Sequence, residues 1–134
     1  MKSVPFLLVI LFISCSLNAQ KIEFKTETID YGTIVKNSNG ERTFSFTNTG
    51  SAPLIINRVQ STCGCTIPKK PEAPIMPGEK GEIKVSYDTK RFGRFNKQII
   101  IFSNAKEARK VIRIKGFVKK EIALGKDKGF MIKN

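Results

Sequence analysis

The stretch Gly81-Glu82-Ile83-Lys84-Val85-Ser86-Tyr87 decides the fold class, because apolar and polar residues alternate along it. Successive side chains of a β-strand point to opposite faces, so Ile83, Val85 and Tyr87 share one face. This pattern predicts a strand with one face buried and the other in water.

The same signal recurs on both sides of this stretch. Phe44 and Phe46 share a face, and further strands are predicted over residues 22–34, 53–59, 95–102 and 111–118. Asn39-Gly40 is the strongest short hairpin signal. No helical period of apolar residues is sustained. The pattern predicts an all-β, Ig-like antiparallel β-sandwich of about seven strands. The absence of tryptophan and of two cysteines at inter-sheet spacing excludes an antibody-type domain.

The first nineteen residues are typical of a secretory signal peptide. Lys2 supplies the positive start, residues 6–13 form an apolar run, and small or polar residues follow up to Ala19. Cleavage between Ala19 and Gln20 is expected. The apolar run is shorter than the roughly 20 residues that span a bilayer, and no later stretch resembles a membrane helix. The sequence therefore predicts export to the periplasm or the cell exterior.

A lipoprotein signal is the alternative for the same segment. Phe12-Ile13-Ser14-Cys15 would be the lipobox and Cys15 the acylated residue, although Phe12 fits that motif poorly. Either interpretation predicts export. The domain is expected over residues 20–118, followed by a basic tail, 119–134, which either frays or adds an edge strand through residues 130–132.

The expected mature chain is strongly basic. It has 134 − 19 = 115 residues, and without Lys2 it carries 23 basic against 11 acidic residues, a net charge of +12. Export and the lack of an aromatic-flanked basic cluster argue against nucleic acid. Solvated strand faces explain many of these charges. The functional alternative is attraction to an anionic envelope surface or an acidic partner protein.

Cys63-Gly64-Cys65-Thr66 holds the two cysteines of the expected mature chain. In an extended strand their Cα atoms would lie roughly 6.6 Å apart, at the outer limit for a disulfide. Gly64 can adopt backbone angles closed to other residues, so a tight turn can bring the sulfurs together. So short a ring adds little stability. The pair is therefore a local clip or packing pair, a labile disulfide that exchanges with a partner, or a metal site.

The metal and redox alternatives have named neighbours. Two thiolates with the thioether of Met76 suit Cu(I), whereas zinc lacks the ligands to complete a tetrahedron. Arg58, Lys69 and Lys70 could lower the pKa of a nearby thiol. The chain contains no histidine, which removes Ser-His-Asp and Cys-His mechanisms. No enzyme activity and no resident cofactor are predicted.

Residues from about Asp30 to Val118 resemble an uncharacterised bacterial Ig-like domain family that is abundant in secreted proteins of the Bacteroidetes. The matching blocks, in order, are Asp30-Tyr31-Gly32, Phe46-Thr47-Asn48-Thr49-Gly50, Ser61-Thr62-Cys63-Gly64-Cys65-Thr66, Ile75-Met76-Pro77-Gly78-Glu79 and Ser103-Asn104. That family is similar to the major-sperm-protein, ASH and PapD-like sandwiches. The resemblance implies a domain that binds proteins or builds assemblies.

The sequence therefore predicts a non-enzymatic binding or assembly module of the cell envelope. Recognition through an edge strand or through a loop is expected, with the segment between Ser61 and Gly78 as the presented surface, because its prolines limit the ordering cost of binding. The candidate contact residues are Thr62, Gly64, Thr66, Pro68, Lys69, Lys70, Pro77 and Gly78. The rival function is thiol-disulfide exchange or Cu(I) handling at Cys63 and Cys65.

Overall fold

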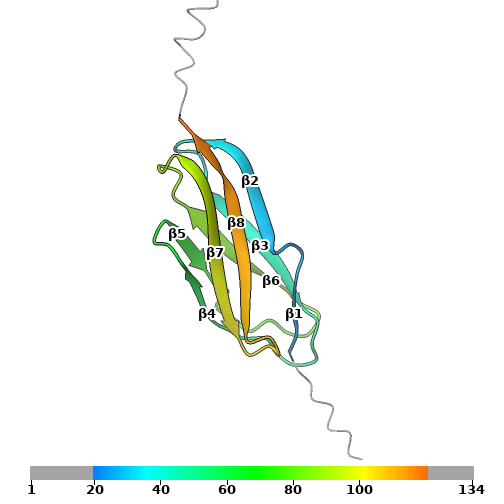
Figure 1. Ribbon diagram of the computed structural model, residues 1–134. Coiled ribbons are helices and arrows are strands. Elements are labelled where there is room, and N and C mark those ends of the chain that lie inside the picture. Colours follow the sequence, from blue (N-terminus) through cyan, green and yellow to red (C-terminus); the bar gives the residue numbers. More distant parts are fainter. Residues whose placement is uncertain (1–19, 121–134) are drawn as a thin grey trace, which may run out of the picture.

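The computed structural model describes residues 20–120, which form two four-stranded β-sheets packed face to face (Figure 1). The predicted signal peptide with Ala19 and Cys15, and the tail beyond Lys120, lie outside the described residues. The strands are β1 Ile22–Phe24, β2 Thr28–Val35, β3 Glu41–Asn48, β4 Ile56–Ser61, β5 Thr66–Lys69, β6 Lys80–Tyr87, β7 Gly93–Ser103 and β8 Arg109–Lys119.

One sheet has the strand order β1-β3-β6-β5 and the other β2-β8-β7-β4. This arrangement confirms the predicted Ig-like sandwich. It differs from the prediction in its first strand, which is split between the sheets. β1 pairs antiparallel with β3, whereas β2 pairs with β8 in parallel, which gives eight strands and one mixed sheet.

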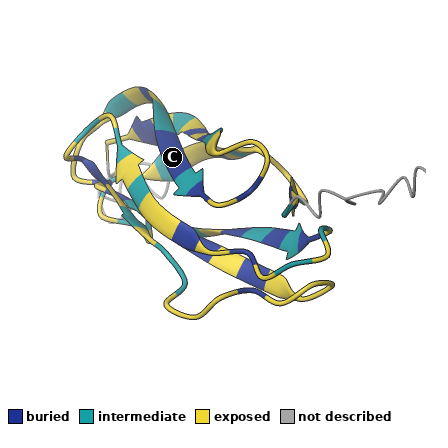
Figure 2. Ribbon diagram, turned by 90° about the horizontal axis from the view of Figure 1, so that it is seen from below, coloured by how far each residue is buried: buried dark blue, intermediate teal, exposed yellow. Residues whose placement is uncertain are grey.

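The core lies between the two sheets and follows the predicted alternation. Figure 2 shows buried and exposed residues alternating along the strands. The fully buried apolar side chains are Phe44, Phe46, Leu54, Ile83, Val85, Ile99, Ile101, Ile112, Ile114 and Val118. Facing apolar sides of two sheets remove this surface from water, which is the main driving force for folding.

Gly81 shows how closely the core is packed. A Cβ atom added to it would lie 2.4 Å from Cζ of Phe46 and 2.9 Å from Cδ1 of Ile75. Neither contact is sterically possible without movement, so the Phe46 ring occupies the space that a larger residue at position 81 would need.

The Asn39-Gly40 prediction is wrong, because the strands on either side belong to different sheets. The Asn39 side chain accepts a hydrogen bond from the Glu41 amide at 2.9 Å, and the Gly40 carbonyl accepts one from the Tyr31 hydroxyl at 2.7 Å. The segment is thus an inter-sheet connection fixed by side-chain hydrogen bonds. Turn residues report a change of direction, and they do not report whether the flanking strands pair.

Asn48 connects two loops at the opposite end of β3, the one that follows β3 and the one that precedes β6. Its side chain is fully buried, and its Nδ2 donates to the carbonyls of Ala52 at 2.8 Å and Ile75 at 2.9 Å. Its Oδ1 accepts from the Gly50 amide at 3.0 Å. This buried amide therefore has partners at both ends, as a buried polar group requires.

The chain then turns into β6 at Pro77-Gly78, as predicted. The Glu79 amide donates to the Met76 carbonyl at 2.9 Å, and Gly78 has a φ of 80°. Proline in the second position and a left-handed glycine in the third define a type II turn.

Candidate functional site

The predicted cysteine motif forms a tight turn between β4 and β5, on the side of the molecule where the chain crosses from one sheet to the other. Cys63 and Cys65 form a disulfide with their Cα atoms 5.2 Å apart. The Thr66 amide donates to the Cys63 carbonyl at 3.2 Å, and the Cys63 amide donates to Ser61 Oγ at 3.1 Å. The turn thus shortens the Cα separation that an extended strand would give.

Gly64 does not make this turn possible through a special backbone angle. The left-handed glycines of the described residues are Gly32, Gly78 and Gly93, and a Cβ atom at Gly64 would have no neighbour within 4 Å. The sequence-based reason for this glycine is therefore wrong, because the turn forms with ordinary backbone angles.

The two sulfur-bearing residues differ in burial. Cys65 is 4% exposed and belongs to the core cluster, whereas Cys63 is half-buried and packs against its margin. Cys65 is further held by the backbone, since its carbonyl accepts from the Asp88 amide at 2.8 Å. Cys63 is therefore the cysteine that a reagent or partner from solvent can reach.

β5 follows the turn and forms an edge of its sheet, with β6 as its partner. Cys65 pairs with Asp88 through a backbone hydrogen bond. Antiparallel hydrogen-bonded pairs alternate, so the amide positions of Thr66 and Pro68 face the free edge. The Thr66 amide is already used within the turn, and Pro68 has no N–H. This edge thus presents carbonyl acceptors without backbone donors, which protects it against strand addition.

Ile67 is the most exposed large apolar side chain in the described part of the chain, at 68%. It lies on the outer face of β5 with Lys69, because these residues alternate with Thr66 and Pro68. Sequence analysis selected the lysines of this segment and missed Ile67. A strand register counted from a buried Thr66 would have found it.

The predicted contact residues divide into three groups. Thr62, Gly64 and Lys69 are exposed, and Pro68 and Lys70 are half-buried beside them. Thr66 is not presented, because it is 3% exposed with its hydroxyl 3.8 Å from Cys65 Sγ. Pro77 and Gly78 are exposed, but they lie at the other end of β6 from the disulfide turn.

The same separation applies to Met76, which is 47% exposed in the turn before β6. The disulfide turn contacts Asp88 after β6, while Met76 contacts Glu79 before it. The nine residue steps from Glu79 to Asp88 span roughly 30 Å of extended chain. The structure therefore does not bring Met76 together with Cys63 and Cys65. Within residues 20–120 no group of three or more His, Cys, Asp or Glu side chains could hold a metal ion.

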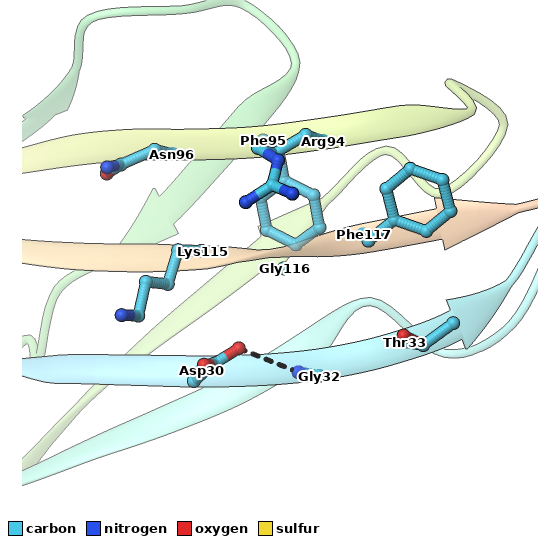
Figure 3. A pocket seen from close by; sticks show the side chains of 9 residues that line it. All are labelled: Asp30, Gly32, Thr33, Arg94, Phe95, Asn96, Lys115, Gly116 and Phe117. Atoms are coloured by element: carbon cyan, nitrogen blue, oxygen red, sulfur yellow. Dashed lines mark hydrogen bonds between the residues drawn. The ribbon is translucent and has the colours of Figure 1, made fainter.

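A second feature is a hollow of about 280 Å³ on the outer face of the other sheet. It lies where the β2–β8 register shifts between Asp30 and Thr33, and where Gly32 carries no side chain and has open space around it. Figure 3 shows the side chains of Arg94, Asn96, Lys115 and Phe117 around it. Asp30 is the one carboxylate in the lining, and its Oδ1 accepts from the Gly32 amide at 2.8 Å.

Several solved structures have the same fold. A protein of unknown function from Porphyromonas gingivalis W83 superposes with a TM-score of 0.67 at 16% identity, over 79% of this chain and 51% of that chain. The chain thus spans about half the length of that protein. The ASH/PapD-like domain 7 of human CEP192 gives a TM-score of 0.64 at 8% identity, over 78% of this chain and 89% of that domain.

A third match is the CsuC–CsuE chaperone–tip adhesion subunit pre-assembly complex of Acinetobacter baumannii. Its TM-score is 0.51 at 16% identity, over 87% of this chain and 66% of that chain. At these identities the similarities establish the fold, a two-sheet β-sandwich, and nothing beyond it. No curated protein matches the sequence. The described part of the chain contains no helix that is long and apolar enough to cross a membrane.

Residues 22–118, which run from the first strand to the last, match the model of a family described as protein of unknown function DUF1573. This match covers most of the sequence and includes both sheets and the disulfide turn. The chain therefore belongs to the DUF1573 family.

Proposed function

We propose that this protein is an exported, non-enzymatic module that binds a protein partner of the cell envelope through the surface around its disulfide turn. We call this surface the turn face and define it as Thr62, Gly64, Ile67, Lys69 and Lys70. The observation that carries the proposal is the 68% exposure of Ile67 on the edge strand beside the turn.

The turn face combines the features of a small recognition surface. Ile67 supplies an apolar centre, and the lysines beside it supply a charged rim, the usual arrangement of a protein–protein contact. The disulfide, Pro68 and the hydrogen bonds of the turn hold the backbone before a partner arrives. The ordering cost of binding is correspondingly small.

Recognition at the turn face would use side chains. A partner strand that added to β5 would find no free backbone donor at Thr66 or Pro68. The specificity of binding would therefore follow substitutions at Ile67 and Lys69.

The similar folds support a binding role as a class. One of them comes from a complex between a chaperone and an adhesion subunit, in which the sandwich has a protein partner. The N-terminal segment with its apolar run at residues 6–13 supports export. The chain has no histidine, which supports a role other than hydrolysis.

Site-specific photo-cross-linking in the native host tests the proposal. A benzophenone amino acid replaces Ile67 in one variant and Ile55, which is 45% exposed at the other end of the molecule, in the control. We expect a discrete cross-linked product from position 67 and none of the same mass from position 55. The cross-linked partner, once purified, should lose about tenfold in affinity for the Ile67→Asp variant. Identical products from both positions, or an unchanged affinity, would contradict the proposal.

Thiol-disulfide exchange is the second candidate, and the unequal burial of the two cysteines favours it. A partner thiolate would attack Cys63 Sγ, form a mixed disulfide and release the Cys65 thiolate. A second partner thiol would then resolve the mixed disulfide, so that the partner is oxidised and the Cys63–Cys65 pair is reduced. The double variant Cys63→Ser, Cys65→Ser separates the two functions. It should retain partner affinity if the turn face binds through Ile67, and it should lose activity if exchange is the function.

A further inference from the structure

We propose that a second surface, at the end of the sandwich where β2 and β8 finish and β7 begins, binds an anionic phospholipid membrane. We call this surface the basic aromatic end and define it as Phe92, Arg94, Lys115, Phe117, Lys119 and Lys120. Figure 1 shows the three strand ends meeting there.

Two exposed phenylalanine rings mark this end. Phe92 is 64% exposed in the connection between β6 and β7, and Phe117 is 43% exposed on the outer face of β8. Both lie on the same end, because Gly93 is in register with Val118 and Arg94 with Phe117. Exposed aromatic rings are costly in water, and a cluster of them indicates an interaction surface.

In the described part of the chain, no ion pair joins the cations around the rings to a carboxylate. The ion pairs within residues 20–120 are Arg91–Asp88, Lys110–Glu27 and Lys110–Glu107, so none involves Arg94, Lys115, Lys119 or Lys120. The Lys120 ammonium instead lies 5.2 Å from the centroid of the Phe92 ring. Asp30 lines the neighbouring hollow with its Oδ1 accepting from a backbone amide. The local charge is therefore positive.

Positive charge is not spread evenly over the molecule. On the outer face of the other sheet, Glu23, Glu41 and Glu82 alternate with Lys25, Lys80 and Lys84. Opposite charges there are interspersed, as on an ordinary solvated surface. The basic aromatic end thus differs from that outer face, where acidic and basic residues are mixed.

The order of rings and cations along the strands fits a membrane surface. On β8, Lys115 precedes Phe117 by two residues and lies roughly 6.6 Å further from the end of the sandwich, whereas Arg94 lies beside Phe117, with which it is in register. An interfacial element buries its apolar groups roughly 5–10 Å into the headgroup boundary. With Phe92 and Phe117 in that boundary, Arg94 lies beside Phe117 and Lys115 lies behind it, so the two cations meet the lipid phosphates at successive depths, and the hollow between them can receive a headgroup (Figure 3).

Vesicle binding measured with a tryptophan reporter tests this inference. The natural chain contains no tryptophan, so Phe92→Trp gives a single probe, and Ile55→Trp at the opposite end is its control. Mass spectrometry first fixes the N-terminus, so that residues 6–13 are present or absent alike in every sample. With vesicles of 70% phosphatidylcholine and 30% phosphatidylglycerol, we expect a blue shift of the indole emission in the Phe92→Trp variant and none in the Ile55→Trp variant.

The affinity measurements use substitutions of exposed residues. Lys119→Gln with Lys120→Gln should lower the partition coefficient about 25-fold, since each cation near an anionic surface contributes about fivefold. Phe92→Ser with Phe117→Ser should lower it at least about tenfold. The matched control, Lys25→Gln with Lys84→Gln on the other sheet, should change it less than about twofold. Binding should weaken steeply as salt rises.

The outcomes that overturn the inference are equally specific. Equal binding to vesicles of pure phosphatidylcholine would show that anionic lipid is not required. An equal loss of binding in the matched control would show that the net charge of the protein, and not this surface, governs binding. Tighter binding to polyglutamate or to a single-stranded oligonucleotide, unchanged by Phe92→Ser, would show a polyanion site in place of a lipid site. Unaltered thermal unfolding of each variant excludes loss of fold as the cause.

Discussion

Replacing Asn48 by alanine should destabilise the domain by about 3 kcal/mol. The substitution removes three hydrogen bonds of the fully buried amide, to Ala52, Ile75 and Gly50. A hydrogen bond contributes about 1 kcal/mol net to stability, and its loss costs more where water cannot replace it. The Ile75 carbonyl keeps the Leu54 amide as a donor, which limits the penalty at that atom.

Asn104 provides a control of the same residue type. Its side chain accepts from the Ile55 amide at 2.8 Å and donates to the Pro53 carbonyl at 3.1 Å, but it is exposed. Water can take over both partners, so Asn104→Ala should cost about 1 kcal/mol or less. Asn48→Asp should be at least as damaging as Asn48→Ala, because a carboxylate would face two carbonyl acceptors.

Urea unfolding followed by circular dichroism measures these differences. The midpoint should shift while the slope with denaturant stays constant, which identifies a change in stability of a two-state domain. If Asn48→Ala and Asn104→Ala lost the same free energy, burial would not govern the strength of these hydrogen bonds. Asn48 would then not hold the two loops together through its buried side chain.

Three further predictions concern packing, ionisation and the disulfide. Gly81→Ala should lower the free energy of unfolding in urea by about 1–3 kcal/mol, because the added methyl group meets the core. Gly64→Ala, with open space around it, should be nearly neutral. Equal losses of stability in the two variants would contradict this account. Burial raises the pKa of Tyr31 to about 12, against the opposing Arg42 cation, so the neutral phenol is favoured in the folded state. The contribution of the neutral Tyr31 phenol to the free energy of unfolding is fully present below pH 10 and is lost as the pH rises towards 12. Tyr31→Phe should remove this part of the pH dependence. Parallel profiles of stability against pH for both proteins would show that Tyr31 does not contribute. Cys63→Ser with Cys65→Ser should lower the unfolding free energy by about 1.5 kcal/mol, half the value for a fifteen-residue loop, and a loss above about 3 kcal/mol would show that the disulfide stabilises more than its own turn.

The core could be predicted from the sequence because one face of each strand is buried. Ile83, Val85 and Tyr87 alternate with polar residues, and a shift of one residue would expose all three. The same constraint fixed the inward faces of β7 and β8. Periodicity is a local property, so it is visible without knowledge of which strands are neighbours.

The pairing of strands and the candidate site depended on topology, which periodicity does not report. Nothing between Phe24 and Thr28 signals that the chain leaves one sheet for the other. Met76 follows the cysteines closely in sequence, yet Met76 and the disulfide lie at opposite ends of β6. Ile67 is apolar, and its exposure follows from two facts together, its place on the outer face of β5 and the position of β5 at the edge of its sheet.

The parallel pairing of β2 with β8 joins the beginning of the domain to its end. β8 lies between β2 and β7, so every fragment that stops before Arg109 lacks an interior strand of its sheet. Such a fragment leaves the apolar faces of β2 and β7 without their neighbour. A ribosome or a translocation channel that releases the chain from its N-terminus therefore handles an incomplete domain until residue 119 has emerged. Contacts between such distant segments also form slowly. The window for chaperone capture, proteolysis or misassembly consequently stays open until the last strand of the domain has been made.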